Sequence, residues 1–210
     1  MADTDEVTDL IRRAAAGEEE PLRDLFSRYR DRLKRMVHLR LSRQLSGRVD
    51  DSDVIQEAYL DAARRLDEYV REPVLPFFLW LRNLTALKLA EVHRRHLGTQ
   101  LRDADREVTL HRGSLPLADS VSLAAQLLGT LTTPSQAVIK AETRLLVQEA
   151  LNSMDPIDRE VLALKHFEQL SMAEIAEVLG LSKARAGSRY LRAIKRLREI
   201  LSQIPGFEAF

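Results

Sequence analysis

Apolar residues recur at helical spacing along most of the chain, and this pattern restricts the fold more than any other feature. Apolar side chains stand three or four positions apart between residues 22 and 37, and again between residues 54 and 69. Side chains at that spacing share one face of an α-helix, which turns once in about 3.6 residues. No stretch alternates apolar and polar residues, as a half-buried strand would. We therefore predict an all-α protein.

A third apolar stripe begins after Pro76, a residue that suits the first turn of a helix because it needs no backbone donor there. Trp80 lies within this stripe, four residues before Leu84. The spacing favours a place for Trp80 in the core, and an exposed stacking surface is the alternative. The stripe comprises Phe77, Trp80, Leu81, Leu84 and Leu87.

The composition changes between residues 98 and 136, where glycine, proline, serine and threonine interrupt the helical pattern. Asp119 is the one charged residue between Gly113 and Gln136. We interpret 98–136 as a linker with one short helix around Val121 to Leu131. The 210 residues, 45% of them hydrophobic, suffice for small domains with their own cores. We expect two small helical domains, residues 5–97 and 137–204, joined by this linker.

The C-terminal part contains a series of helix-start signals. These are "TPSQ" (133–136), "DPID" (155–158) and "SMAE" (171–174), in which Ser or Thr or Asp can cap the helix. Gly180 suits the left-handed position that ends a helix, and Ser182 can cap the next one. A short helix, a turn and a long helix follow in that order. This pattern predicts a helix-turn-helix at the C-terminus.

The last predicted helix, residues 183–201, has one apolar and one cationic face. In a helix-turn-helix the second helix enters the major groove, and its first residues reach the bases. Arg185 and Arg189 are the candidates for base contact, because a guanidinium can bond O6 and N7 of guanine together. Arg192, Lys195 and Arg196 lie further along and are candidates for phosphate contact. The alternative is a surface helix whose arginines are only solvated. The full set of candidate duplex contacts is Lys183, Arg185, Ser188, Arg189, Arg192, Lys195 and Arg196.

Charge is distributed in blocks, although 32 basic and 32 acidic residues cancel. Residues 21–49 contain nine basic and two acidic residues, whereas residues 50–75 contain eight acidic residues and three arginines. Separate surfaces could therefore face anionic and cationic partners. Ordinary solvated helix faces are the alternative.

Several classes of protein are disfavoured. The chain has no cysteine, so it forms no disulfide or thiolate metal site, and it has no P-loop, dinucleotide-binding glycine pattern or nucleophile elbow. Its acidic start does not resemble a signal peptide, and no apolar run approaches the roughly 20 residues that span a bilayer. We expect a cytoplasmic protein without membrane insertion, catalytic residues, metal or cofactor.

Two groups of residues could in principle hold a metal ion. His93 and His96 have helical spacing, but the arginines between them favour phosphate contact. Asp50, Asp51 and Asp53 could bind Mg²⁺, but acidic residues at a helix start need no metal, because they favour the positive end of the helix dipole.

The motifs "DVIQE" (53–57), "FFLWL" (77–81) and "FEQLSMAEIAEVLGLS" (167–182) follow one another along the chain. In this order they resemble the extracytoplasmic-function sigma factors of bacterial RNA polymerase. "DDSDVIQEAYLDAARRLDEY" (50–69) resembles their polymerase-binding segment. "PFFLWLRNLTALKLAEVHRRH" (76–96) is similar to the segment that follows it in the family. "ALNSMDPIDREVLALKHFEQLSMAEIAEVLGLS" (150–182) resembles the C-terminal sigma domain. The resemblance extends over roughly residues 10–97 and 137–202.

The resemblance implies a partner for each segment. The first would bind core RNA polymerase, the second would capture the −10 element of promoter DNA as a single strand, and the last helix would bind the −35 duplex. An anti-sigma factor is a further candidate partner, and the linker would run toward the polymerase channels or serve as a tether. The implied polymerase-binding residues are Asp53, Val54, Ile55, Gln56 and Glu57. The implied −10 residues are Arg82, Asn83, Lys88, His93, Arg94 and Arg95.

The sequence departs from the family where bases would be read. Residues 84–87 are "LTAL" where the family commonly has I-A-R-N, and residues 184–189 are "ARAGSR" where it often has G-T-V-K-S-R. Gly187 inside a helix costs about 1 kcal/mol relative to alanine. The promoter sequence therefore does not follow from the resemblance. The competing class is a stand-alone helix-turn-helix repressor or activator, which would have no use for the segment Asp53–Glu57.

Overall fold

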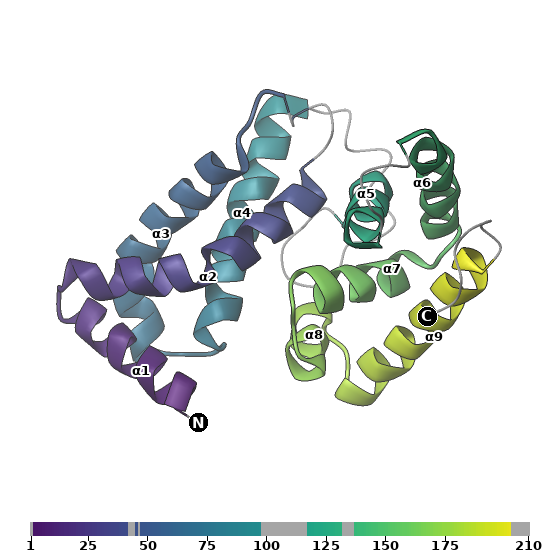
Figure 1. Cartoon of the computed structure of the whole chain (residues 1–210). Coiled ribbons are helices and arrows are strands. Elements are labelled where there is room, and N and C mark those ends of the chain that lie inside the picture. Colours follow the sequence, from purple (N-terminus) through teal and green to yellow (C-terminus); the bar gives the residue numbers. More distant parts are fainter. Residues whose placement is uncertain (1, 42–44, 46, 98–116, 132–136, 203–210) are drawn as a thin grey trace. The chain divides into compact units, whose positions relative to one another are not determined.

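The computed structural model describes residues 2–41, 45, 47–97, 117–131 and 137–202 (Figure 1). These residues form helices and turns and contain no strand, which confirms the predicted all-α class. The chain divides into two compact units. The first comprises Met1–Val37 with Leu41–Leu115, and the second comprises His38–Arg40 with Pro116–Phe210.

The first unit is built around the long helices α3 and α4, which pack along each other, while α1 also contacts α3. Asp50 caps α3 as predicted, because its side chain accepts a hydrogen bond from the Ser52 amide at 2.7 Å. The apolar stripes of α2, α3 and α4 supply the buried side chains, including Leu25, Ala58 and Leu81. The helices are α1 (Ala2–Ala15), α2 (Glu19–Arg40), α3 (Asp51–Arg71) and α4 (Phe77–Leu97).

Aromatic side chains join three helices of this unit. Trp80 of α4 stacks on Tyr69 of α3, with ring centroids 4.7 Å apart, and lies beside Phe77 at 5.5 Å. Tyr29 of α2 approaches Phe78 at 5.2 Å. Trp80 is therefore a packing residue, as its spacing predicted, although part of its side chain stays accessible.

The second unit contains the predicted helix-turn-helix. Asp155 caps α7, Ser171 and Glu174 form the predicted capping box of α8, and Gly180 ends α8 with φ 62°. A π-helical turn, η2, follows α7 directly and was not predicted. The elements are α5 (Ser120–Leu131), α6 (Ala137–Asn152), α7 (Pro156–Leu162), η2 (Ala163–Phe167), α8 (Met172–Leu179) and α9 (Lys183–Leu201). The start signal 133–136 lies outside the described residues.

Helix α5 belongs to the core of the second unit. The helix expected around Val121 to Leu131 is present, and it packs on α6. Its residues Leu123, Ala124 and Leu128 are buried in one cluster with side chains of α6, α7 and α9. Helix α5 thus lies within the predicted linker 98–136 and packs in the core of the second unit. An almost uncharged helix is stable there because it buries its apolar side chains.

A buried ion-pair cluster also belongs to the second unit. Arg40, at the end of α2, pairs with Glu160 and with Glu168, the latter at 2.6 Å. The second carboxylate oxygen of Glu160 accepts a hydrogen bond from the Ala118 amide at 2.8 Å. Burial alone would lower the pKa of Arg40, but the two carboxylates outweigh it and raise this pKa. The buried charges are thus compensated by one another.

Candidate partner and nucleic-acid interfaces

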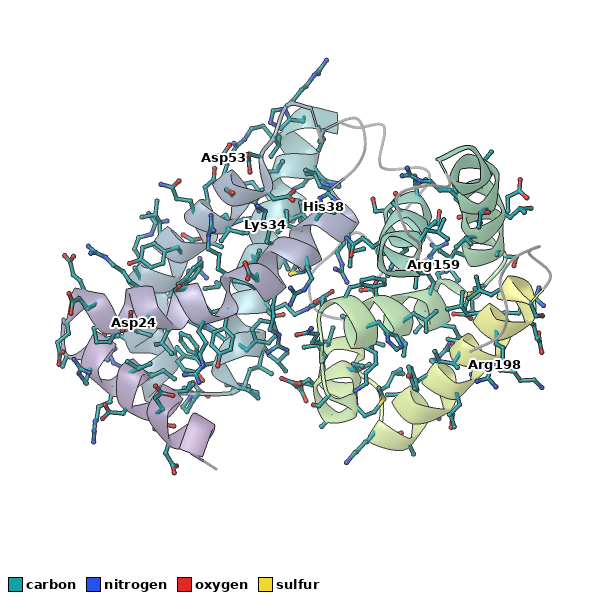
Figure 2. The ribbon with its side chains drawn as sticks, in the orientation of Figure 1. Asp24, Lys34, His38, Asp53, Arg159 and Arg198 are labelled. Atoms are coloured by element: carbon teal, nitrogen blue, oxygen red, sulfur yellow. The ribbon has the colours of Figure 1, made fainter. Side chains whose placement is uncertain are left out.

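The outward face of α3 carries the polar residues of the predicted polymerase-binding segment. Asp53 and Gln56 are exposed, and Glu57 is half-buried. Figure 2 shows Asp53 on the outer side of α3, near the start of the helix. Leu60 lies one turn after Gln56 and is 50% exposed. The face therefore combines carboxylate, amide and apolar groups.

Val54 and Ile55 of the same predicted set face inward. They are 1% and 3% exposed, respectively, and contribute to the core of the first unit. Two adjacent residues of a helix lie about 100° apart, so a segment of five cannot present all its side chains to one partner. Val54 and Ile55 therefore anchor α3 in the core of the first unit. The accessible part of this segment consists of Asp53, Gln56 and, in part, Glu57.

Helix α4 exposes only some of the residues predicted to bind the −10 strand. Asn83, Arg94 and Arg95 are exposed, whereas Arg82 and His93 are 1% and 6% exposed. Arg95 pairs with Glu91 at 2.9 Å on the surface, an interaction that solvent weakens. The predicted cationic track is therefore shorter than expected, because α4 buries more than half of its circumference.

Lys88, also predicted for this track, is bound within the first unit. Its ammonium lies 2.8 Å from the carboxylate of Asp61 in α3 and 3.5 Å from that of Glu91. The hydrogen bond to Asp61 raises the pKa of Lys88, and hydrogen bonds from Lys88 and Arg64 lower the pKa of Asp61. Lys88 thus connects α4 to α3 instead of standing free for a nucleic acid.

The cationic face of α9 is exposed over most of its length. Lys183, Arg185 and Ser188 of its first turns are exposed, and the buried residues Ala186, Ala193 and Leu197 lie on the opposite side. The predicted two-faced character of this helix is therefore confirmed. The other exposed members of the predicted set are Arg192, Lys195 and Arg196.

Arg189, predicted to contact bases, is held by two carboxylates of α7. Its Nη1 atom lies 2.7 Å from Oδ1 of Asp158 and 3.2 Å from Oδ1 of Asp155, and its side chain is only 23% exposed. The hydrogen bond to Asp158 is the main reason that the pKa of Arg189 is raised. Arg192 also approaches Asp158, with Nε 3.2 Å from Oδ2. The arginines of α9 therefore differ in how freely they can meet a ligand.

Comparison with known proteins relates both units to one family. A family model described as "Sigma-70, region 4" matches residues 144–197, which include α7, η2 and α8 and most of α9. The chain is 23% identical to the ECF RNA polymerase sigma factor SigW of Bacillus subtilis, over 92% of this chain and 96% of that protein. It is 22% identical to the ECF sigma factor BldN of Streptomyces coelicolor, over 95% of this chain and 67% of that protein. Over both units the chain is similar to extracytoplasmic-function sigma factors, and residues 144–197 match sigma-70 region 4.

A solved structure supports the helical fold of the chain. The structure of CnrH in complex with the cytosolic domain of CnrY resembles the chain with a TM-score of 0.57, covering 94% of this chain and 98% of that one, at 22% sequence identity. A further relative, the RNA polymerase sigma-E factor of Streptomyces antibioticus, is 41% identical over 58 residues, which are 28% of this chain and 32% of that protein.

These surfaces also contain residues that the sequence patterns did not indicate. Leu60 and Leu87 are each 50% exposed. The expectation that Leu87 belongs to the apolar core stripe of α4 is therefore wrong, because Leu87 lies one turn after the exposed Asn83 and shares its side of the helix. Asp158 was read only as part of a helix start, and no local pattern connects it to arginines more than 30 positions away. Within the described ranges there is no group of side chains that could hold a metal ion, and no helix long and apolar enough to cross a membrane.

Proposed function

We propose that this chain binds core RNA polymerase and directs transcription initiation at specific promoters. The observation that carries the proposal is a helix-turn-helix with an exposed cationic helix, within a region 4 match, in a chain whose sigma-factor relatives align with both units. A stand-alone repressor would need the second unit but not the exposed polar face of α3. The polymerase supplies the chemistry of RNA synthesis, so the chain itself needs no catalytic group.

The outward face of α3 is the proposed polymerase contact. Its exposed residues Asp53, Gln56 and Leu60 occupy successive turns on one side of the helix. Interfaces take most of their affinity from a few well-buried side chains, surrounded by polar groups that give orientation. Leu60 has the apolar surface for the first role, and Asp53 and Gln56 have the groups for the second.

The exposed surface of α4 is the proposed contact to the −10 strand. Arg94 and Arg95 can follow a phosphate backbone, and Asn83 can hydrogen-bond an unpaired base. Leu87 lies on the same side of α4 as Asn83, one turn later, and offers an apolar surface to a base. Arg82 and His93 are buried, and Lys88 pairs with Asp61 and Glu91, so these three residues are left out of the proposed contact.

The first turns of α9 are the proposed contact to the −35 duplex. Lys183, Arg185 and Ser188 are exposed there, so they can reach base edges when α9 lies in the major groove. Arg192, Lys195 and Arg196 would lie against the phosphates. Because the polymerase acts on the chromosome, we place the chain in the cytoplasm. An anti-sigma factor is a proposed further partner, as the structural neighbour CnrH was solved in complex with the cytosolic domain of CnrY.

Transcription with purified core RNA polymerase on genomic DNA fragments tests the proposed function. We expect new start sites that depend on the added chain, and a shared sequence upstream of them. Tight binding to duplex DNA without polymerase, together with no new start site, would contradict the proposal and favour a repressor.

A variant of the polymerase-facing helix provides the control. Gln56→Ala should weaken binding to core polymerase and reduce the yield of the new transcripts, because Gln56 is exposed on the proposed contact face. It should leave binding of the chain to duplex DNA unchanged, because α9 lies in the other unit. Equal loss of both activities would mean that the polymerase contact has been assigned to the wrong helix.

A further inference from the structure

One buried carboxylate, that of Asp158, contacts two arginines of α9. Its side chain is 5% exposed, and its two oxygens are divided between the arginines. Oδ1 accepts a hydrogen bond from Nη1 of Arg189 at 2.7 Å, and Oδ2 lies 3.2 Å from Nε of Arg192. Asp158 therefore contacts two arginines that lie almost one turn apart on the same helix.

The two arginines have different surroundings. Arg189 is 23% exposed, and Asp155 provides it with a second carboxylate at 3.2 Å. Arg192 is 63% exposed, and Asp158 is its one recorded ionic partner among the residues that the structure describes. A guanidinium has five N–H donors in a planar fork. Contact through Nε therefore leaves the two terminal nitrogens of Arg192 toward solvent, beside exposed Lys195 and Arg196.

We propose that Asp158 is a positioning residue that holds the guanidinium of Arg192 in place for a phosphate of duplex DNA, and that Arg189 is an internal clamp between α9 and α7 instead of a base-reading residue. This inference rests on the proposed contact of α9 with duplex DNA. A planar guanidinium fixed at one edge can meet two phosphate oxygens with its other nitrogens. A side chain that is already ordered loses less conformational freedom when the DNA binds.

Whether removal of the Asp158 carboxylate strengthens or weakens DNA binding distinguishes a positioning role from a long-range effect of its negative charge. Removing an acidic group near DNA should strengthen binding if only long-range charge matters. Removing a group that positions a phosphate-binding arginine should weaken it. Glu199 is the matched control, because it lies 3.5 Å from Arg196 of the same helix but both side chains are about half exposed.

The experiment uses the full chain and a 20-base-pair duplex selected from a random pool by the wild-type chain, with affinity measured over a range of salt concentrations. Core polymerase is left out, so the result stands whether or not the chain directs transcription. We expect Asp158→Asn to weaken binding about threefold to tenfold and to lower the salt slope by about 1, as loss of one phosphate contact does. Glu199→Gln should leave affinity unchanged or raise it.

A double variant and a conservative variant complete the test. In the Arg192→Ala chain, the further change Asp158→Asn should have little additional effect on affinity or slope. Arg192→Lys keeps the charge but lacks the guanidinium fork, so it should bind almost as weakly as Arg192→Ala, even if Asp158→Asn does not fold. Wild-type affinity in Arg192→Lys, tighter binding by a folded Asp158→Asn chain, or failure of the wild-type chain to select any duplex would overturn the inference.

Discussion

Two glycines of the helix-turn-helix have different backbones. Gly180 ends α8 with φ 62°, a conformation that residues with a Cβ rarely adopt. Gly187 lies inside α9, and a Cβ placed on it would meet no other atom within 4 Å. The same residue type is therefore required at one position and costs stability at the other.

Alanine substitutions at these glycines should have opposite effects. Gly187→Ala should raise the free energy of unfolding of the second unit by about 0.5–1 kcal/mol, because it restricts the unfolded chain and suits a helix. Gly180→Ala should lower it by about 1–2 kcal/mol, because alanine is strained in the left-handed region. Urea denaturation followed by circular dichroism measures both. Destabilisation by Gly187→Ala would mean that a close contact at this position has been overlooked.

The Asp61–Lys88 pair leads to a pH-dependent prediction. The pKa of the Asp61 carboxyl is lowered in the folded chain, mainly by the hydrogen bond from Lys88 and then by that from Arg64. Its contribution is therefore present above the pKa of an unfolded aspartate, about 3.9, and is lost as the pH falls through the lower folded value. Asp61→Asn should lower the free energy of unfolding at pH 7 by about 1–3 kcal/mol.

The stability difference between the wild-type chain and Asp61→Asn should shrink as the pH is lowered from neutral to about 3, because only the wild-type carboxylate becomes protonated. Thermal or urea unfolding at several pH values measures this. A difference that stays constant over the whole range would show that the carboxylate charge does not stabilise the contact between α3 and α4.

Helix α3 has one face that packs in the core of the first unit and one face that is exposed and available to a partner. Leu60 is 50% exposed and Ile55 is 3% exposed, although they lie only five positions apart. Leu60→Ala should reduce affinity for core polymerase by about fivefold or more, as for a residue worth about 1 kcal/mol at an interface, and should leave the melting temperature unchanged.

Ile55→Ala is the matched control on the same helix. It should lower the free energy of unfolding of the first unit by about 2–5 kcal/mol, because it leaves a cavity in the core. Polymerase binding should be retained at temperatures where this variant is folded. Pull-down or biolayer measurements with core enzyme, alongside thermal unfolding, distinguish the two effects. Loss of stability without loss of affinity in Leu60→Ala would contradict the proposed contact.

For the whole molecule, the position of the domain boundary determines which helices belong to each folding unit. The chain carries no net charge, yet cationic side chains concentrate on α9 and acidic ones on the polar face of α3. The second unit also includes α5, which lies in the segment first interpreted as linker. A boundary drawn from composition would remove this helix.

Two fragments of the chain test the boundary. Both fragments lack Arg40, so they differ only by residues 116–136. Residues 137–210 lack Leu123 and Leu128, which are 1% and 6% exposed in the full chain, whereas residues 116–210 retain them. Burial of one leucine contributes about 1.5–3 kcal/mol, so the shorter fragment should be less stable by about 3 kcal/mol or more. Calorimetry or urea unfolding measures the difference. Equal stability would mean that α5 does not contribute to the core in solution.

The all-α class, the helix caps and the two-faced character of α9 follow from local sequence patterns. These features depend on neighbours within one or two turns, so spacing and residue type suffice to predict them. Asp155, the Ser171–Glu174 pair and Gly180 all act locally, and each was recognised from a short pattern.

Which charged residues are accessible to a partner depends instead on how the helices pack. Lys88 and Arg189 have the residue type of nucleic-acid contacts, but Asp61 and Asp158, at distant positions in the chain, bind them. The composition of the segment that contains α5 is typical of a linker. The segment forms part of a core because apolar side chains of α6, α7 and α9 pack against it. The physical reason is the same in each case. Contacts between residues distant in sequence depend on how the helices pack, and a local sequence pattern does not show which distant residue will be in contact.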